Sequence, residues 1–224
     1  MSTPDTLSAA VFASGGGSNF QSLLAHQGEG TPWRIRVLVA DRPGIGALER
    51  AERAGVAARV IPTKGRSAEA VADETLATLR EHDVGVIFLA GYLKLVPAPV
   101  IAAYRGRILN IHPALLPSFG GKGMWGIHVH RAVLASGARL SGPTVHLVDE
   151  EYDRGMIVAQ WPVPVLSGDT AETLAARVLQ VEHRLYPLAA DHVCRALLEG
   201  REAVPLAPPG EAFGLVPDAA APGL

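Results

Sequence analysis

Two polar residues, Asn110 and His112, close the otherwise apolar segment 108–112 of the chain. If this segment is a β-strand, its two-residue period puts both side chains on one face. An asparagine amide can donate a hydrogen bond to a developing oxyanion, and an imidazolium can do so more strongly. Because buried polar groups need partners, the pair indicates either an oxyanion-stabilising site or two structural residues satisfied by neighbouring loops.

A glycine-rich segment follows the first predicted strand and opens a predicted helix, with the sequence Ser14-Gly15-Gly16-Gly17-Ser18-Asn19. Glycines let the backbone approach a ligand closely, and a helix N-terminus offers unpaired N–H groups to an anion. The segment therefore predicts a phosphate-binding loop. It lacks the Gly-Lys-Ser/Thr end of a Walker A motif, and Phe20 stands at the third glycine position of a dinucleotide fingerprint. A tight turn without ligand, or a dinucleotide site completed by Asp41, remains the alternative.

The composition is typical of a soluble globular protein, with 48% hydrophobic residues, 19% charged residues and a net charge of -2. No basic stretch offers the clustered Lys and Arg that bind phosphates, so we expect no nucleic acid partner. No apolar run approaches the ~20 residues that span a bilayer, so we expect no membrane partner. The lone Cys194 and the lack of a signal-peptide pattern predict a cytoplasmic protein.

Three further histidines are candidates for a site. His128 and His130 lack a third ligand at suitable spacing, so we expect no metal. His146 lies in an apolar segment, which favours a core histidine with satisfied hydrogen bonds.

Apolar runs alternate with helical patterns through the first half of the chain, which predicts a parallel sheet with right-handed crossovers. Later residues predict an antiparallel strand pair and one long helix. The expected strands cover residues 7–14, 33–41, 58–63, 84–90, 108–112, 142–148 and 157–165, and the expected helices cover residues 18–26, 45–54, 67–81, 130–136 and 169–199, with a helical turn or two at 100–104.

The predicted fold class is therefore α/β, as one Rossmann-like domain. We expect a mostly parallel twisted sheet with helices on both faces and an antiparallel strand pair late in the chain. The domain is expected to span residues 1–206, and the Pro-, Ala- and Gly-rich residues 207–224 to form a poorly ordered tail. Ligands in such folds bind outside the carboxyl ends of the strands, where both candidate motifs lie.

Several segments together resemble one enzyme family. Asn110-Ile111-His112-Pro113-Ala114-Leu115-Leu116-Pro117 closely resembles the Asn-Ile-His-Pro-Ser-Leu-Leu-Pro signature of formyltransferases that use 10-formyltetrahydrofolate. The glycine loop is similar to the phosphate loop of the branch that formylates glycinamide ribonucleotide in purine biosynthesis. Similar stretches are also found at residues 41–51, 144–149, 153–155 and 182–188, so the resemblance runs from about Ala9 to Gly200.

The resemblance implies a reaction and its catalytic residues. The formyl group of 10-formyltetrahydrofolate passes to the primary amine of glycinamide ribonucleotide, and no metal takes part. Asn110 and a protonated His112 stabilise the tetrahedral oxyanion. Asp153, in an acidic turn, is the catalytic carboxylate, and a carboxylate near His112 is expected to raise the pKa of the imidazole and keep it protonated.

The resemblance also implies which residues bind the two substrates. Gly17, Ser18 and Asn19 hold the ribonucleotide phosphate, and Glu182 meets its glycinamide end. Lys94 stands where the family often has Arg, and a lysine lacks the planar pair of donors that makes a bidentate contact. The residues implied in folate binding are Arg66, Leu93, Lys94, Leu95, Val96 and Asn110.

Two alternatives remain open: a related enzyme with a different formyl acceptor, and a binding protein without catalytic activity. Water or an aminoacyl-tRNA as acceptor would make the chain a formyltetrahydrofolate deformylase or another formyltransferase. A non-catalytic phosphate- or dinucleotide-binding module would leave Asn110, His112 and Asp153 unexplained together. The expected partners are the two small-molecule substrates, and the expected state is a monomer or homodimer.

Overall fold

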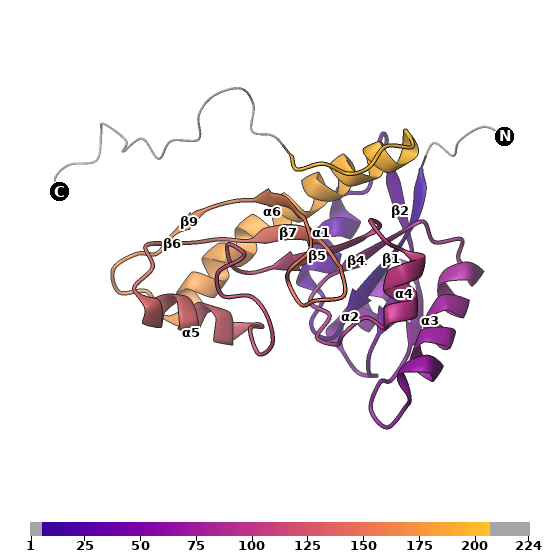
Figure 1. The fold of residues 1–224 in the computed structure, drawn as a ribbon, viewed down its shortest axis with the longest axis horizontal. Helices are drawn as coiled ribbons and strands as arrows, with labels where there is room; N and C mark the ends of the chain where they lie inside the picture. Colours follow the sequence, from indigo (N-terminus) through magenta and orange to yellow (C-terminus); the bar gives the residue numbers. More distant parts are fainter. Residues whose placement is uncertain (1–5, 207–224) are drawn as a thin grey trace.

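The computed structural model describes residues 6–206, and the predicted tail at 207–224 lies outside them. The main sheet has seven strands in the order β3-β2-β1-β4-β5-β7-β8. The elements, drawn in Figure 1, are β1 (Leu7–Ala13), α1 (Ser18–His26), β2 (Trp33–Ala40), α2 (Gly46–Arg53), β3 (Ala57–Val60), α3 (Ala68–Glu81), β4 (Val86–Leu89), α4 (Ala98–Ala103), β5 (Ile108–His112), α5 (Ile127–Ser136), β6 (Leu140–Ser141), β7 (Thr144–Leu147), β8 (Ile157–Gln160), β9 (Val163–Pro164) and α6 (Ala171–Leu198).

The predicted fold class is confirmed. Strands β1 to β5 pair in parallel, while β7 pairs antiparallel with β5 and β8 antiparallel with β7. The order steps outward from β1 to β3 on one side and through β4 to β5 on the other, so the chain reverses its direction of winding between β1 and β4. Such a switch point opens a crevice at the carboxyl ends of the strands.

The late strand pair differs from the prediction because each strand is interrupted. Gly142-Pro143 separates β6 from β7, and Trp161-Pro162 separates β8 from β9. Proline has no N–H to donate to a ladder, and a Cβ at Gly142 would lie 1.9 Å from the carbonyl oxygen of Trp161. The outer halves, β6 and β9, therefore pair separately and, with α5, form the end of the molecule on the left of Figure 1.

Helix boundaries follow local capping. Ser67 is the N-cap of α3, as predicted, and its hydroxyl accepts from the N–H of Ala70 at 3.1 Å. Thr170 caps α6 through a reciprocal capping box with Thr173. α5 begins at Ile127 and not at His130, so the histidine predicted to open the helix lies inside its first turn.

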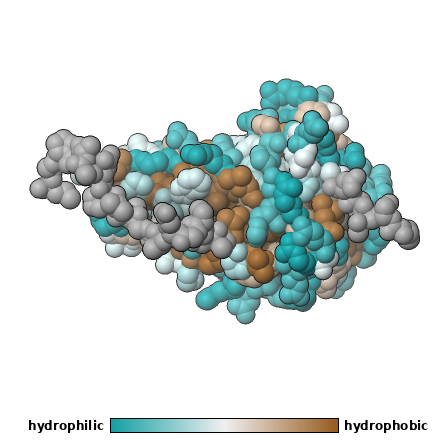
Figure 2. All heavy atoms as spheres, turned by 90° about the horizontal axis from the view of Figure 1, so that it is seen from above, coloured by the Kyte–Doolittle hydropathy of each residue, from teal (hydrophilic) through white to brown (hydrophobic). Residues whose placement is uncertain are grey.

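Helices cover both faces of the sheet, and alternate residues of β1 divide the core between them. Ala9 and Val11 pack in the cluster with α1, α2 and α6, whereas Ala10 and Phe12 pack with α3 and α4. Figure 1 shows α3 and α4 together on one side of the sheet. The face drawn in Figure 2 is mostly hydrophilic, with apolar residues gathered near its middle.

None of the helices in residues 6–206 combines the length and the apolar composition needed to cross a membrane.

Candidate active site

A cavity of about 740 Å³ lies at the carboxyl edge of β4 and β5, between the segment 121–127 and α6. It brings together most of the residues that the sequence singled out. Those that line it are Asn19, Leu93, Lys94, Leu95, Val96, Asn110, His112, Asp153 and Glu182. Gly17, Ser18 and Arg66 are not among its lining residues.

The strand β5 presents Asn110 and His112 to this cavity, as its two-residue period predicts. The imidazole of His112 is buried, and its Nε2 lies 2.9 Å from the carbonyl oxygen of Phe119. Because a carbonyl only accepts, Nε2 carries a proton. Nδ1 of the same ring lies 3.7 Å from Oδ2 of Asp153, so both ring nitrogens face an acceptor.

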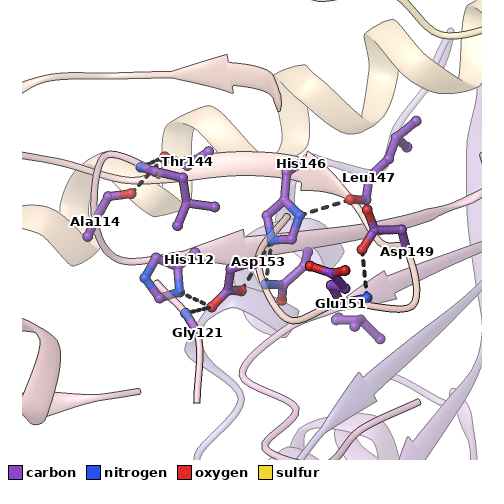
Figure 3. A network of polar contacts seen from close by, with 12 residues as sticks. His112, Ala114, Gly121, Thr144, His146, Leu147, Asp149, Glu151 and Asp153 are labelled. Carbon is purple, nitrogen blue, oxygen red and sulfur yellow. Dashed lines mark hydrogen bonds and ion pairs between the residues drawn. The ribbon is translucent and has the colours of Figure 1, made fainter. Parts of the chain in front are cut away.

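Asp153 lies between two imidazoles, as Figure 3 shows. Its Oδ2 accepts from the N–H of Gly121 at 2.8 Å and faces His112, while its Oδ1 lies 3.5 Å from Nε2 of His146. The residue has a φ of +56°, in the left-handed region that Asp and Asn tolerate better than most residues. The turn after β7 thus directs this carboxylate back toward β5.

The electrostatics of the pair correct one expectation. Burial acts to raise the pKa of Asp153, but the neighbouring imidazoles of His146 and His112 and the hydrogen bond from the N–H of Gly121 outweigh it and hold the pKa below its ordinary value. Burial lowers the pKa of His112 below 6.5, and Asp153 and the Phe119 carbonyl oppose this only in part. Asp153 thus raises the pKa of His112, as expected, but burial has the larger effect, so the net shift of that pKa is downward.

His146 belongs to this site, although its apolar sequence context favoured a core role. It is buried, lines the cavity, and pairs with Asn110 across β5 and β7. Its Nδ1 lies 2.9 Å from the carbonyl oxygen of Leu147, and its Nε2 lies 3.0 Å from Nδ2 of Asn110. Nδ1 therefore carries the proton, and Nε2 accepts from the Asn110 amide. Only the antiparallel register places His146 here, and sequence alone does not fix that register.

His130 also lies in the cavity, which the sequence did not predict. It is 4% exposed, and its Nδ1 is buried without a hydrogen-bond partner among the described residues. Burial and the neighbouring His112 lower its pKa. No group of three or more potential metal ligands occurs in residues 6–206.

The glycine loop approaches the cavity from the end of β1. Gly17 has a φ of +74° immediately before α1. In the first turn of α1, Nδ2 of Asn19 donates to Oε2 of Glu182 on α6 at 2.6 Å. Glu182 is 7% exposed, and burial raises its pKa against the opposing effect of that hydrogen bond. The contact ties the glycine loop to α6 at one end of the cavity.

The segment after β4 forms another wall. The N–H of Leu93 donates to Oγ of Ser14 at 2.9 Å, which joins this segment to the glycine loop. Nζ of Lys94 lies 3.9 Å from Oδ2 of the buried Asp41. Arg66 lies elsewhere, because its guanidinium contacts Glu74 at 2.6 Å and the carbonyl oxygen of Ala70 at the start of α3.

The fold and this site define a member of a known class. Residues 7–190 match the model of the formyl transferase family, and the chain belongs to that family. It is similar to the phosphoribosylglycinamide formyltransferase, chloroplastic, of Vigna unguiculata, with 46% identity over 88% of this chain and 64% of that protein. The Arabidopsis thaliana protein of the same name is 47% identical, over 88% of this chain and 69% of the relative.

A solved structure agrees with this similarity. The crystal structure of the phosphoribosylglycinamide formyltransferase from Brucella melitensis has a TM-score of 0.78 and 49% sequence identity, and the match covers 84% of this chain and 96% of that one. The chain thus spans less than two thirds of the Vigna relative but nearly all of the Brucella one.

Proposed function

We propose that this protein transfers the formyl group of 10-formyltetrahydrofolate to the primary amine of glycinamide ribonucleotide. The observation that carries the proposal is the convergence of Asn110, His112 and Asp153 on one cavity that the hydrogen-bonded pair Asn19 and Glu182 also lines. The names of the similar proteins support the same acceptor. The Gly-Ser-Asn end of the glycine loop favours a phosphorylated acceptor over water.

The cavity suits two substrates of different chemistry. Apolar side chains, among them Leu89, Val96 and Ile101, line one part and suit the flat pterin ring. Asn19 and Glu182 line another part, where Glu182 is the proposed partner of the glycinamide amine. Gly17 and Ser18, at the N-terminus of α1, are the proposed phosphate ligands. Leu93, Lys94 and Leu95 are the proposed folate contacts, and the folate contact expected of Arg66 stays a prediction.

The proposed reaction begins when the neutral amine attacks the formyl carbon and the formyl oxygen becomes an oxyanion. An asparagine amide has two N–H groups. Because His146 holds one of them, the other is free to donate to that oxygen. His112 adds positive charge once it is protonated, which its two acceptors, Asp153 and the Phe119 carbonyl, favour.

The remaining steps move one proton and break one bond. The attacking amine loses a proton, and N10 of the folate gains one as its bond to the formyl carbon breaks. Asp153 and His112 lie side by side and form the proposed proton relay. No covalent enzyme intermediate is needed, and the buried Cys194 takes no part.

An absorbance assay of folate deformylation, with and without glycinamide ribonucleotide, tests the proposal. We expect release of the formyl group that depends on the ribonucleotide. Release at the same rate without it would identify a deformylase, and no release would identify a non-catalytic module.

We place the reaction in the cytoplasm, in keeping with the free Cys194. The expected oligomeric state, a monomer or a homodimer, stays a prediction.

A further inference from the structure

Three consecutive carbonyl groups of the glycine loop are held by one neighbouring segment, residues 42–50. The carbonyl oxygen of Gly15 accepts from the N–H of Ala47 at 3.1 Å. The carbonyl oxygen of Gly16 accepts from Nε of Arg50 at 2.8 Å. The carbonyl oxygen of Ser14 accepts from Nη2 of Arg42. Two of these three donors are guanidinium groups.

This arrangement determines where the N–H groups of the loop point. In a trans peptide the C=O and N–H groups point in opposite directions. The N–H groups of Gly15, Gly16 and Gly17 therefore point away from α2, and none of them donates to another backbone group in residues 6–206. Successive free N–H groups of this kind form a concave anion site.

Two further contacts fix Arg50 as a link between α2 and α1. Its Nη1 lies 3.0 Å from Oε1 of Gln21, in the first turn of α1. Its Cδ lies 3.3 Å from the position that a Cβ on Gly17 would occupy. The positive charge of Arg50 also acts on His183 of α6. Burial lowers the pKa of His183, and the charge of Arg50 lowers it further.

A second feature beside the loop indicates a ligand independently. Asn19 is 8% exposed and lines the cavity, and its Oδ1 is buried without a hydrogen-bond partner in the described part of the chain. A buried acceptor without a partner is destabilising unless a ligand donor satisfies it. The loop therefore borders a site with one unused acceptor and several unused donors.

We propose that Arg50, assisted by Arg42, is a positioning residue for phosphate binding. By holding the outward carbonyls, the two guanidinium groups keep the loop N–H groups directed at the phosphate, and they add positive charge behind the loop. Neither residue lines the cavity, so both act through the loop and not by contact. This inference rests on the proposed phosphate loop.

Binding of ribose 5-phosphate, with ribose as the uncharged comparison, tests the role without any formyl transfer. For Arg50→Gln, we expect affinity for ribose 5-phosphate to fall ~10-fold, the loss of about one charge-assisted hydrogen bond. Arg50→Lys keeps the positive charge but loses the planar set of guanidinium N–H donors, so we expect an affinity for ribose 5-phosphate between those of the unaltered protein and Arg50→Gln. Arg53→Gln is the matched control, because Arg53 is exposed on the same helix and, among the residues that the structure describes, hydrogen-bonds to the carbonyl oxygen of Glu49 in its own helix.

Two results would overturn the inference in distinguishable ways. If Arg50→Gln and Arg53→Gln bound ribose 5-phosphate equally well, Arg50 would have no positioning role while the phosphate loop stood. If the unaltered protein bound ribose 5-phosphate no better than ribose, the phosphate loop itself would be wrong. The formyl transfer assay is independent of both results.

Steady-state kinetics separate positioning from a general structural role. For Arg50→Gln, we expect KM for glycinamide ribonucleotide to rise ~10-fold, with kcat and KM for 10-formyltetrahydrofolate nearly unchanged. A parallel rise in both KM values with a lower Tm would show a merely structural brace and overturn the proposal. If Arg50→Gln fails to fold, Arg42→Gln provides the same comparison, since Arg42 is half exposed at the other end of the loop.

Discussion

Asn110 and His146 face each other directly across the antiparallel pair of β5 and β7, with Nδ2 of Asn110 3.0 Å from Nε2 of His146. The carbonyl of Leu147 fixes the tautomer of His146, and His146 in turn fixes the orientation of the Asn110 amide. The proposed oxyanion donor is therefore held by a second strand. Catalytic donors that are oriented in advance need no rearrangement during the reaction.

This relationship predicts that His146→Ala lowers kcat by ~10-fold or more, because the Asn110 amide loses the partner that orients it. KM for the folate is expected to change little. Steady-state kinetics beside His192→Ala, a histidine outside the cavity, provide the comparison. A His146→Ala enzyme with unchanged kcat would show that Asn110 keeps its orientation without this partner.

The proposed oxyanion donors give the largest expected effects. Asn110→Ala and His112→Ala should each lower kcat by at least ~10²-fold, the usual result of removing one such donor. Folding is checked by circular dichroism and Tm. If either variant stayed folded and kept nearly full kcat, that residue would have no catalytic role.

Asp153→Asn tests the carboxylate with little disturbance of the backbone, since Asn also tolerates the φ of +56° found at this position. Asp153 raises the pKa of His112 against the larger effect of burial. Removing its charge lowers that pKa further, so the imidazole is protonated only at lower pH. We expect lower kcat and an alkaline limb of the kcat profile, on which His112 loses its proton, that moves to lower pH. An unmoved limb with full kcat would contradict the coupling.

Local patterns in the sequence were enough for the first half of the fold and for the two residues on β5. The helix at Ser18–His26 and the strand at Ile108–His112 have the predicted bounds, because glycine and apolar runs mark them clearly. Asn110 and His112 lie on one side of a strand, and strand periodicity alone places them together.

Non-local pairing could not be predicted in this way. His146 reaches the site only through the register of β5 with β7. The prolines at 143 and 162 shorten the late strands because each interrupts the pairing with the neighbouring strand, so that β6 and β9 pair separately. The guanidinium of Arg66 pairs with Glu74 on α3, a tertiary contact that the sequence does not specify, and Arg66 does not line the cavity. The net effect of burial on His112 likewise depends on packing that the sequence does not specify.

Gly17→Ala is expected to destabilise the protein. The residue has a φ of +74°, and an added Cβ would lie 2.8 Å from Cβ and 2.9 Å from Cα of Ala47. Strain of this kind typically costs about 1–3 kcal/mol. Gly15→Ala is the matched control, because nothing lies within 4 Å of its Cβ position. Urea unfolding of both variants checks the difference, and equal stabilities would contradict the close packing of the loop on α2.

Glu182→Gln should separate stability from function. Burial raises the pKa of Glu182 above 4.5, so the folded state favours the protonated acid. This contribution to stability is complete below pH 4.5 and is lost as pH rises through the folded-state pKa. A neutral glutamine keeps an oxygen to accept from Asn19 but has no charge to desolvate. The variant should therefore gain stability relative to the unaltered protein as pH rises, while KM for glycinamide ribonucleotide increases because the amine loses its proposed partner.

Urea unfolding from about pH 5 to about pH 8 measures this gain, and kinetics at the upper pH measure KM. Glu172→Gln supplies a control of opposite sign. Glu172 is exposed in the first turn of the same helix, and its pKa is lowered by hydrogen bonds from its own backbone N–H and from Thr170. Its charge favours folding above its unfolded-state pKa, so removing that charge should slightly weaken stability at neutral pH. A loss of stability in Glu182→Gln at the upper pH, like that expected of Glu172→Gln, would contradict the prediction. It would mean that the ionised carboxylate of Glu182 stabilises the folded protein, so that the residue would not cost stability in exchange for substrate binding.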